Sequence, residues 1–265
     1  MKRLRALASF ISGAVIGTLG GLIGLGGAEF RLPLLVGAFR FAVLDAVILN
    51  KAMSLVVVGA ALPFRAGAVP LSLVAANGTV IVNLLAGSLL GAWIGAGWAM
   101  RMDAARLHRV IALLLVLIAG ALLFGHGVAG GAAGGGGPPL DGLALIAAGT
   151  VAGFAIGVVA SILGVAGGEL LIPTLVLLFG VDVKLAGSLS LAISLPTMIA
   201  GFSRYARDRS LSVLARNRGF VLLMAAGSLA GAFIGGRLLG VVPESVLLPV
   251  LSAILLLSAA KMWRH

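Results

Sequence analysis

The sequence contains no cysteine, which excludes disulfide bonds, cysteine metal sites and thiol chemistry. Its three histidines, at positions 108, 126 and 265, have no spacing typical of metal ligands. The phosphate-binding pattern G-x-x-x-x-G-K-[ST] is also absent, which leaves ion gradients or the membrane potential as energy sources. We therefore expect neither a metal centre nor a cofactor.

Charged residues are scarce, at 10% of the chain against about 25% in soluble domains. Hydrophobic residues make up 61%, and the mean hydropathy is +1.20. Apolar runs such as 110–124, 220–234 and 246–260 each supply most of a helix that crosses a hydrocarbon core of roughly 30 Å. The period-two alternation of membrane β-strands is missing. The sequence thus predicts an all-α integral membrane protein, embedded in membrane lipid.

Basic residues outnumber acidic ones by 19 to 8, giving a formal net charge of +11. Such a charge can attract nucleic acid, but most of these residues form short clusters between apolar segments, so we expect no nucleic-acid partner. The positive-inside rule places the clusters, and with them both termini, on the cytoplasmic side. The clusters lie at 2–5, 101–109, 204–218 and 261–264.

The chain repeats itself at an offset of 140 positions. The segment GSLLGAWIGA from Gly87 matches GSLAGAFIGG from Gly227, and an earlier block agrees on the same offset. In that block Gly13, Gly17, Gly24, Gly27, Glu29 and Pro33 match Gly153, Gly157, Gly164, Gly167, Glu169 and Pro173. We predict a first membrane repeat at 1–124, a Gly/Pro-rich linker at 125–141 and a second membrane repeat at 142–265.

The two repeats are predicted to have inverted topology. The linker lacks Lys and Arg and is expected outside, so the first repeat begins inside and the second begins outside. Loop 101–109 is basic, whereas its counterpart 241–245 has no Lys or Arg. Inverted repeats are typical of secondary transporters, whose substrate site lies at the repeat interface near the bilayer midplane.

Each repeat opens with a glycine-rich stretch that disfavours a continuous helix, GLGGA at 24–28 and GVAGG at 164–168. Pro33 and Pro173 follow, and proline fits poorly inside a long helix. The segment 29–39 is too short to cross the membrane alone. Each repeat is therefore predicted to contain a broken or re-entrant helical hairpin plus about three transmembrane helices.

Backbone amides at these breaks can bind an anion, because a helix N-terminus presents donors and a positive dipole end. The alternative is close packing, which glycines at spacings of three or four residues permit between membrane helices, as at Gly13 and Gly17. Glu29 and Glu169 follow the breaks and are proton-coupling candidates, since burial lets a carboxyl exchange protons near neutral pH. Alternatively, they cap the half-helices.

Among the cations of the first repeat, Arg31 and Lys51 are expected deep in the membrane, whereas Arg40 and Arg65 are expected near segment ends, as is Asp45. Arg31 and Lys51 can attract an anion, or can instead pair with an acidic residue or extend to the interface. Asn50, Ser54, Asn83, Ser190, Ser194 and Thr197 are candidates to line a polar path. The predicted substrate-binding residues are Gly26, Gly27, Ala28, Glu29, Arg31, Lys51, Ser54, Gly167, Gly168, Glu169, Ser190 and Ser194.

These residues resemble the sulfite exporter TauE/SafE family, whose repeated signature is G-x-G-G-G followed by proline. Here the signature stands at 24–28 with Pro33 and at 164–168 with Pro173, with Ala28 and Ala166 each replacing one glycine. The resemblance spans essentially the whole chain. It implies export of sulfite, organosulfonates or related sulfur-containing anions across the bacterial inner membrane.

The leading hypothesis is accordingly a secondary transporter of a small anionic substrate, working by alternating access and open to proton coupling. An anion channel is the alternative, because half-helices that meet at the midplane can also line a pore. An intramembrane hydrolase is disfavoured, since no histidine lies in a polar membrane cluster. Faces of small residues are compatible with a homodimer.

Overall fold

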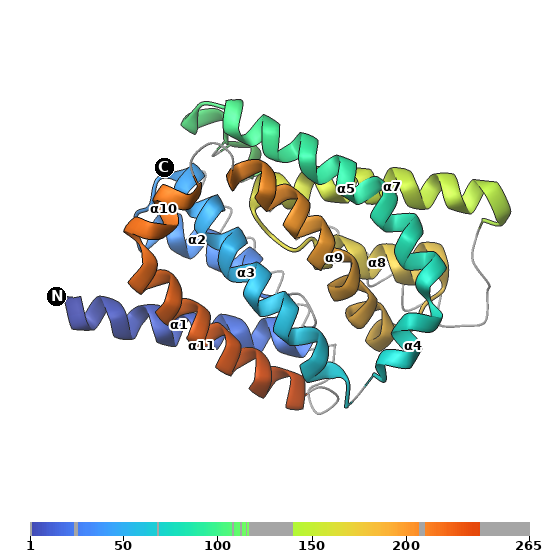
Figure 1. Cartoon of the computed structure of the whole chain (residues 1–265), viewed down its shortest axis with the longest axis horizontal. Helices are drawn as coiled ribbons and strands as arrows, with labels where there is room; N and C mark the ends of the chain where they lie inside the picture. The colour runs from blue at the N-terminus through green and yellow to red at the C-terminus, as the bar shows by residue number, and fades with distance from the viewer. Residues whose placement is uncertain are drawn as a thin grey trace.

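The computed structural model describes residues 2–23, 26–67, 69–107, 109–111, 113–114, 116, 140–206 and 210–238. These residues form ten helices and no strand (Figure 1). Five of the described helices are long and apolar enough to cross a membrane. The chain is thus an all-α, multi-pass membrane protein, as its composition predicts.

Each repeat opens with the predicted broken hairpin. The helix after each break has only 10 or 12 residues, too short to cross roughly 30 Å of hydrocarbon. Gly27 and Gly167 directly precede these short helices with φ of 70° and 80°, a left-handed conformation that glycine adopts without steric cost. The hairpins are α1 (Lys2–Ile23) with α2 (Ala28–Gly37), and α7 (Gly142–Leu163) with α8 (Gly168–Phe179).

The breaks arise from the glycines alone. Pro33 and Pro173 each occupy the sixth position inside α2 and α8, where we had expected proline to contribute to the interruption. A proline at that point removes one backbone hydrogen bond, and both short helices continue past it.

Two central helices, one from each repeat, are the most buried of the membrane-crossing helices. The remaining long helices lie around them, and two short helices precede α5 and α11 (Figure 1). The central helices are α3 (Val43–Arg65) and α9 (Val183–Ala206); the others are α4 (Leu71–Ala76), α5 (Gly78–Arg101), α10 (Ser210–Arg216) and α11 (Arg218–Arg237).

The repeats interlock through their outer helices, because α1 packs along α11 and α7 packs along α5. Both pairs run parallel and approach closely through glycines: Gly17 lies against the backbone of Ser228, and Gly91 against that of Phe154. The packing interpretation of these outlying glycines is confirmed. They face other helices of the same chain, so the predicted homodimer gains no support from them.

The contact pattern of one repeat recurs in the other, with α1, α2, α3 and α5 matched by α7, α8, α9 and α11. In Figure 1 the first helices of the repeats run in opposite senses, α1 from the left and α7 from the right. How each repeat is oriented in the membrane stays a prediction. The linker up to residue 139, most of 110–124 and the segment 246–260 lie outside the described residues.

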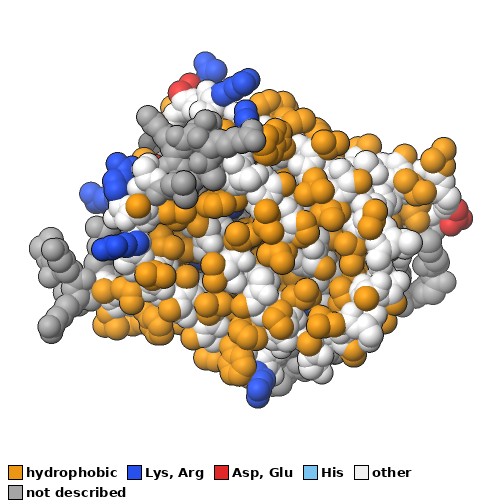
Figure 2. Space-filling view, viewed as in Figure 1, with side chains coloured by type: hydrophobic (Ala, Val, Ile, Leu, Met, Phe, Trp, Pro, Cys, Tyr) orange, Lys and Arg blue, Asp and Glu red, His pale blue; other side chains and the backbone are white. Residues whose placement is uncertain are grey.

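Basic side chains are unevenly distributed over the surface. On the face drawn in Figure 2, most Lys and Arg side chains gather at the left and upper left, over α10 and the end of α5. The end of α5 and the start of α11 carry the basic clusters that we expect on the cytoplasmic side.

We predict that Gly91→Ala destabilises the protein by about 1–3 kcal/mol, because the new Cβ would overlap the carbonyl oxygen of Phe154 and force α5 away from α7. Gly97→Ala in the same helix is the matched control, since its nearest atom would be Nε of Arg204 at 3.8 Å. Alanine favours a helix over glycine by about 1 kcal/mol, so the control should be neutral or stabilising. Thermal unfolding of both variants in detergent would test this; equal melting temperatures would contradict the packing.

Candidate functional site

Five charged side chains of the described residues are almost fully buried in the bundle, each at most 2% exposed. An ionisable side chain at membrane depth is energetically costly and marks a functional candidate. Three are basic and two are acidic, so positive charge is in excess. They are Glu29, Arg31, Lys51, Arg65 and Glu169.

The burial of Arg65 corrects a sequence expectation. It is the last residue of α3, yet α1 and α9 cover its side chain, which is 2% exposed. Its guanidinium donates hydrogen bonds of 3.3 Å to the carbonyl oxygens of Gly21 and Lys184. Arg65 lies at a segment end, as expected, but its side chain is buried because the last turn of α1 and the first turns of α9 pack against it.

Arg31 lies at the centre of the buried cluster and is fully buried. Nη1 donates to Ser54 Oγ at 2.9 Å and to Asn50 Oδ1 at 3.4 Å. Nη2 donates to the carbonyl of Gly26 at 3.4 Å and to Ser228 Oγ at 3.3 Å. One guanidinium therefore connects α2, the turn before it, α3 and α11, and joins the two repeats.

Arg31 forms no salt bridge within the described part of the chain. The ion pair found among these residues joins Arg106 to Asp103 at the surface. Its Nε–H also has no acceptor among those residues. Buried donors are nearly always hydrogen-bonded, so an orphan donor on a buried cation requires an explanation. Pairing with an acidic residue, one of the alternatives for Arg31, is not seen at contact distance among the described residues.

Asn50 holds the two breaks together. Its Nδ2 donates to the carbonyl of Ala28, at the start of α2, at 2.9 Å and to the carbonyl of Gly164, at the end of α7, at 3.1 Å. The second break is held similarly, because Ser194 Oγ donates to the carbonyl of Ala166 at 2.7 Å. The predicted residues of both repeats thus meet around one centre.

Glu29 and Glu169, the second residues of α2 and α8, are electrostatic neighbours at this centre. None of their four carboxyl oxygens has a hydrogen-bond partner within the described ranges. The residues that directly precede the short helices, Gly27 and Gly167, have no side chain with which to cap them. Two ionised carboxylates cannot hydrogen-bond to each other, but a pair that holds one proton can.

Two predicted site residues lie apart from Arg31. Lys51 is buried and donates from Nζ to Ser161 Oγ of α7 at 3.0 Å. Ser190 is also buried, and its hydroxyl donates to the carbonyl of Gly187 in its own helix at 2.8 Å. Lys51 therefore belongs to the same buried polar region as Arg31, but it contacts a different helix, α7.

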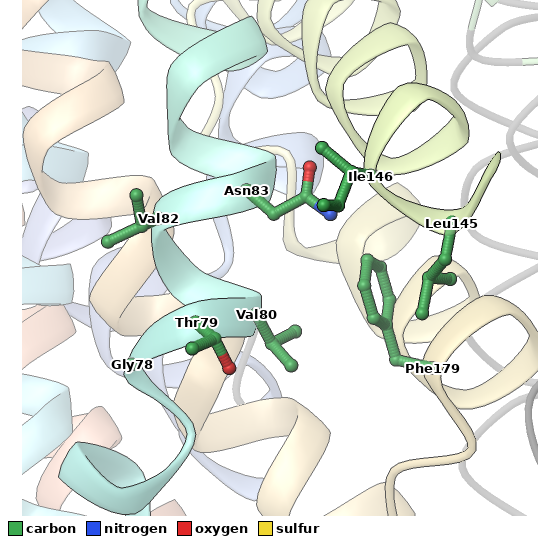
Figure 3. Close-up of a pocket in the computed structure, with 8 residues that line it drawn as sticks. All are labelled: Gly78, Thr79, Val80, Val82, Asn83, Leu145, Ile146 and Phe179. Atoms are coloured by element: carbon green, nitrogen blue, oxygen red, sulfur yellow. The ribbon is translucent and has the colours of Figure 1, made fainter. Parts of the chain in front are cut away.

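Asn83 does not line a path through this region. It accepts a hydrogen bond of 3.1 Å from Thr150 and borders a pocket of about 550 Å³ between α5, α7 and α8. Figure 3 shows that apolar side chains such as Ile146 and Phe179 surround it. None of the five buried charges borders this pocket. Thr197, another expected path residue, instead hydrogen-bonds to Ser88 at 2.7 Å.

Comparison of the sequence with models of known protein families gives a match. A family model described as Sulfite exporter TauE/SafE matches residues 1–122 and 149–265, most of the chain. The chain belongs to the sulfite exporter TauE/SafE family. Searches of curated proteins and of solved structures each returned no match. Membership of the TauE/SafE family supports a membrane anion transporter.

The TauE/SafE signature covers the glycine turns, and the duplication and the scarcity of charge indicated both glutamates, but sequence reasoning missed three serines that contact the buried cations. Their partners lie more than 100 positions away along the chain, so local spacing carries no signal for the pairing. Serine is also common in membrane helices, where it often bonds only to its own backbone. The missed residues are Ser161, Ser188 and Ser228.

We predict that Asn50→Ala lowers the stability of this TauE/SafE protein by about 1–3 kcal/mol, because two buried carbonyls lose their shared donor. Asn77→Ala is the control, since that side chain donates at 2.9 Å to Leu73 within its own turn. Thermal unfolding in detergent should show a large loss only for Asn50→Ala. Similar losses would argue against Asn50 as the bridge between the breaks.

Proposed function

We propose that this protein is a secondary transporter that exports small sulfur-containing anions, such as sulfite or organosulfonates, across the bacterial inner membrane by alternating access. Arg31 carries the proposal: it is a fully buried cation without a salt bridge and with an orphan Nε–H among the described residues. An anion bound there would accept that hydrogen bond and compensate the charge. The family assignment supports the same class of activity.

The groups around Arg31 suit an anion with several oxygens. Ser54 and Ser228 accept hydrogen bonds from the guanidinium and each keeps a hydroxyl hydrogen to donate. Arginine recognises planar or pyramidal oxyanions through donors of fixed geometry. A sulfite or sulfonate group offers three acceptor oxygens, one for each of these donors.

We infer that the glutamate pair couples proton binding to anion binding. If Glu29 and Glu169 were both ionised, they would repel an anion held by Arg31; a single such repulsion is about 4 kcal/mol at 4 Å and an effective dielectric constant of about 20. A proton shared by the pair reduces that repulsion. By thermodynamic linkage, the anion in turn favours protonation.

In this scheme the membrane potential, which is negative inside and provides about 2.3 kcal/mol per charge for each 100 mV, drives export of an anion that moves with net negative charge. Doubly charged sulfite with one proton keeps one net negative charge, whereas singly charged methanesulfonate with one proton is electroneutral and follows its own concentration gradient. We infer that both termini are cytoplasmic from the basic clusters beside the membrane segments. The near-complete burial of all five charged groups is consistent with a conformation closed to both sides.

We predict that the purified protein in liposomes moves labelled sulfite or methanesulfonate with saturable kinetics and counterflow. Arg31→Gln should raise the half-saturation constant on the order of tenfold or more, because a charge-assisted hydrogen bond contributes about 1.5–3 kcal/mol. Arg101→Gln, which changes an exposed arginine at the end of α5, is the control and should leave transport unaltered.

Failure of the wild-type protein to move either anion under any imposed gradient would overturn the proposal. Single-channel conductance and flux that does not saturate would instead establish the anion channel. An unchanged half-saturation constant in Arg31→Gln would remove Arg31 from the binding site.

We predict that methanesulfonate binds more tightly as the pH falls, because the shared proton removes negative charge beside the anion. The sulfonate itself does not titrate in this range, so the effect reports on the protein. Glu29→Gln and Glu169→Gln keep a hydrogen-bonding side chain but cannot titrate, so binding should persist while its pH dependence weakens and proton movement falls.

Asp103→Asn, an exposed carboxylate in the 101–109 loop, is the control and should retain the wild-type pH profile. Affinity would be measured by thermal shift at two pH values, and proton movement with a dye inside the same vesicles. A wild-type pH profile in both glutamine variants would exclude the pair as the proton carrier.

A further inference from the structure

The three buried cations share an arrangement that crosses the repeat interface. All three belong to the first repeat, and each donates a hydrogen bond to a serine hydroxyl of the second repeat, with every serine at most 1% exposed. The offset of 140 puts Leu171, Leu191 and Tyr205 at the corresponding positions, so the second repeat supplies no matching cations. The pairs are Arg31 with Ser228 at 3.3 Å, Lys51 with Ser161 at 3.0 Å and Arg65 with Ser188 at 3.4 Å.

The pair of Arg65 and Ser188 lies at the end of α3, where α9 begins. The other two guanidinium nitrogens of Arg65 donate to the carbonyl oxygens of Gly21 and Lys184 at 3.3 Å. Within the described part of the chain, Arg65 forms no ion pair. All three hydrogen bonds are longer than the usual 2.9–3.0 Å and end on neutral acceptors, so they leave the positive charge uncompensated.

Arg65 and Lys51 mark two levels along the interface of α3 and α9. They are separated by 14 residues of one helix, roughly 21 Å of rise. Arg65 contacts the first turns of α9, whereas a Cβ on Gly201, near the end of α9, would lie 2.6 Å from Lys51 Nζ. This separation covers about two thirds of a hydrocarbon core of roughly 30 Å.

The end of α3 that carries Arg65 is the outer end in the predicted topology, because 66–100 has no Lys or Arg before the basic loop at 101–109. Lys184 is exposed at the start of α9, and its backbone carbonyl accepts a hydrogen bond from the buried guanidinium. The carboxylate of Asp182 accepts hydrogen bonds from the backbone N–H groups of Lys184 and Leu185 and forms no ion pair with Lys184 among the described residues.

We propose that Arg65 and Ser188 form a second binding site for the transported oxyanion, at the outer end of the α3–α9 interface and apart from the level of α3 at which Arg31 contacts Asn50 and Ser54. This inference rests on the proposed function. An oxyanion at the outer site replaces the long bonds to neutral carbonyls with charge-assisted bonds from Arg65, and the Ser188 hydroxyl donates to it. Release of Gly21 and Lys184 loosens α1 and α9 from the end of α3.

A purely structural clamp is the competing explanation, since Arg65 joins α1, α3 and α9. The two roles predict different effects when the anion is supplied from one side of the membrane or from the other. A clamp affects folding and the maximal rate in both directions, whereas a binding site at one end affects the half-saturation constant for anion offered at that end.

The test measures sulfite and methanesulfonate transport by the full chain in right-side-out and inside-out membrane vesicles. Arg65→Gln should raise the half-saturation constant from the outer side on the order of tenfold and leave the value from the inner side within about twofold. Lys51→Gln removes a cation at the level of Arg31 rather than at the outer end of α3, so it should not show this preference for the outer side. Arg65→Lys keeps the charge and should retain most of the affinity, and Arg101→Gln is the control.

If Arg65→Gln does not fold, Ser188→Ala is the second test of the outer site, because this variant leaves the cation in place. It should raise the outer half-saturation constant by a smaller factor, about threefold for one neutral hydrogen bond. Equal half-saturation constants from both sides in Arg65→Gln and Ser188→Ala, with a lowered maximal rate and melting temperature, would establish the clamp. If vesicles with the wild-type protein transport neither anion, the proposed function and this inference are both overturned.

Discussion

The placement of charge inside an apolar bundle is the constraint on which the rest of this structure depends. Ionised groups at membrane depth are unstable unless neighbouring dipoles, hydrogen bonds or opposite charges compensate them. The hydrogen-bond partners of Arg31 and Arg65 are neutral groups: hydroxyls, a side-chain amide and backbone carbonyls. Within the described part of the chain neither arginine forms a salt bridge, although Glu29 is an electrostatic neighbour of Arg31, so an anionic substrate could provide further compensation.

The duplication explains how these groups come together although neither repeat could bind an anion in this way alone. The first repeat contributes the buried cations and the second contributes a serine to each. The glutamates come one from each repeat and meet at the centre. Relative movement of the repeats would therefore change every cation–serine contact at once, which is how rocking of one repeat against the other could alter anion affinity.

Local features were predictable from the sequence, whereas long-range pairing was not. The glycine turns and the short helices follow from conformational preference, and the scarcity of charge singled out Glu29 and Glu169, which are buried. The burial of Arg65 depends on how the last turn of α1 and the first turns of α9 pack against the end of α3, which no local pattern encodes. The role of Asn50 likewise depends on the approach of Gly164, 114 positions away. The spacing of the outlying glycines indicated close helix packing, but not which helices pair, and the partners lie in the other repeat.

The central claim is that anion binding and protonation of the glutamate pair are linked at one buried site. Isothermal calorimetry of methanesulfonate binding to the detergent-solubilised protein, repeated in buffers of different ionisation enthalpy, measures the protons taken up per anion bound. The linkage predicts net uptake of a fraction of a proton, up to one, that passes through a maximum as the pH is varied. Binding without proton uptake at every pH, from mildly acidic to mildly basic buffer, would contradict the account.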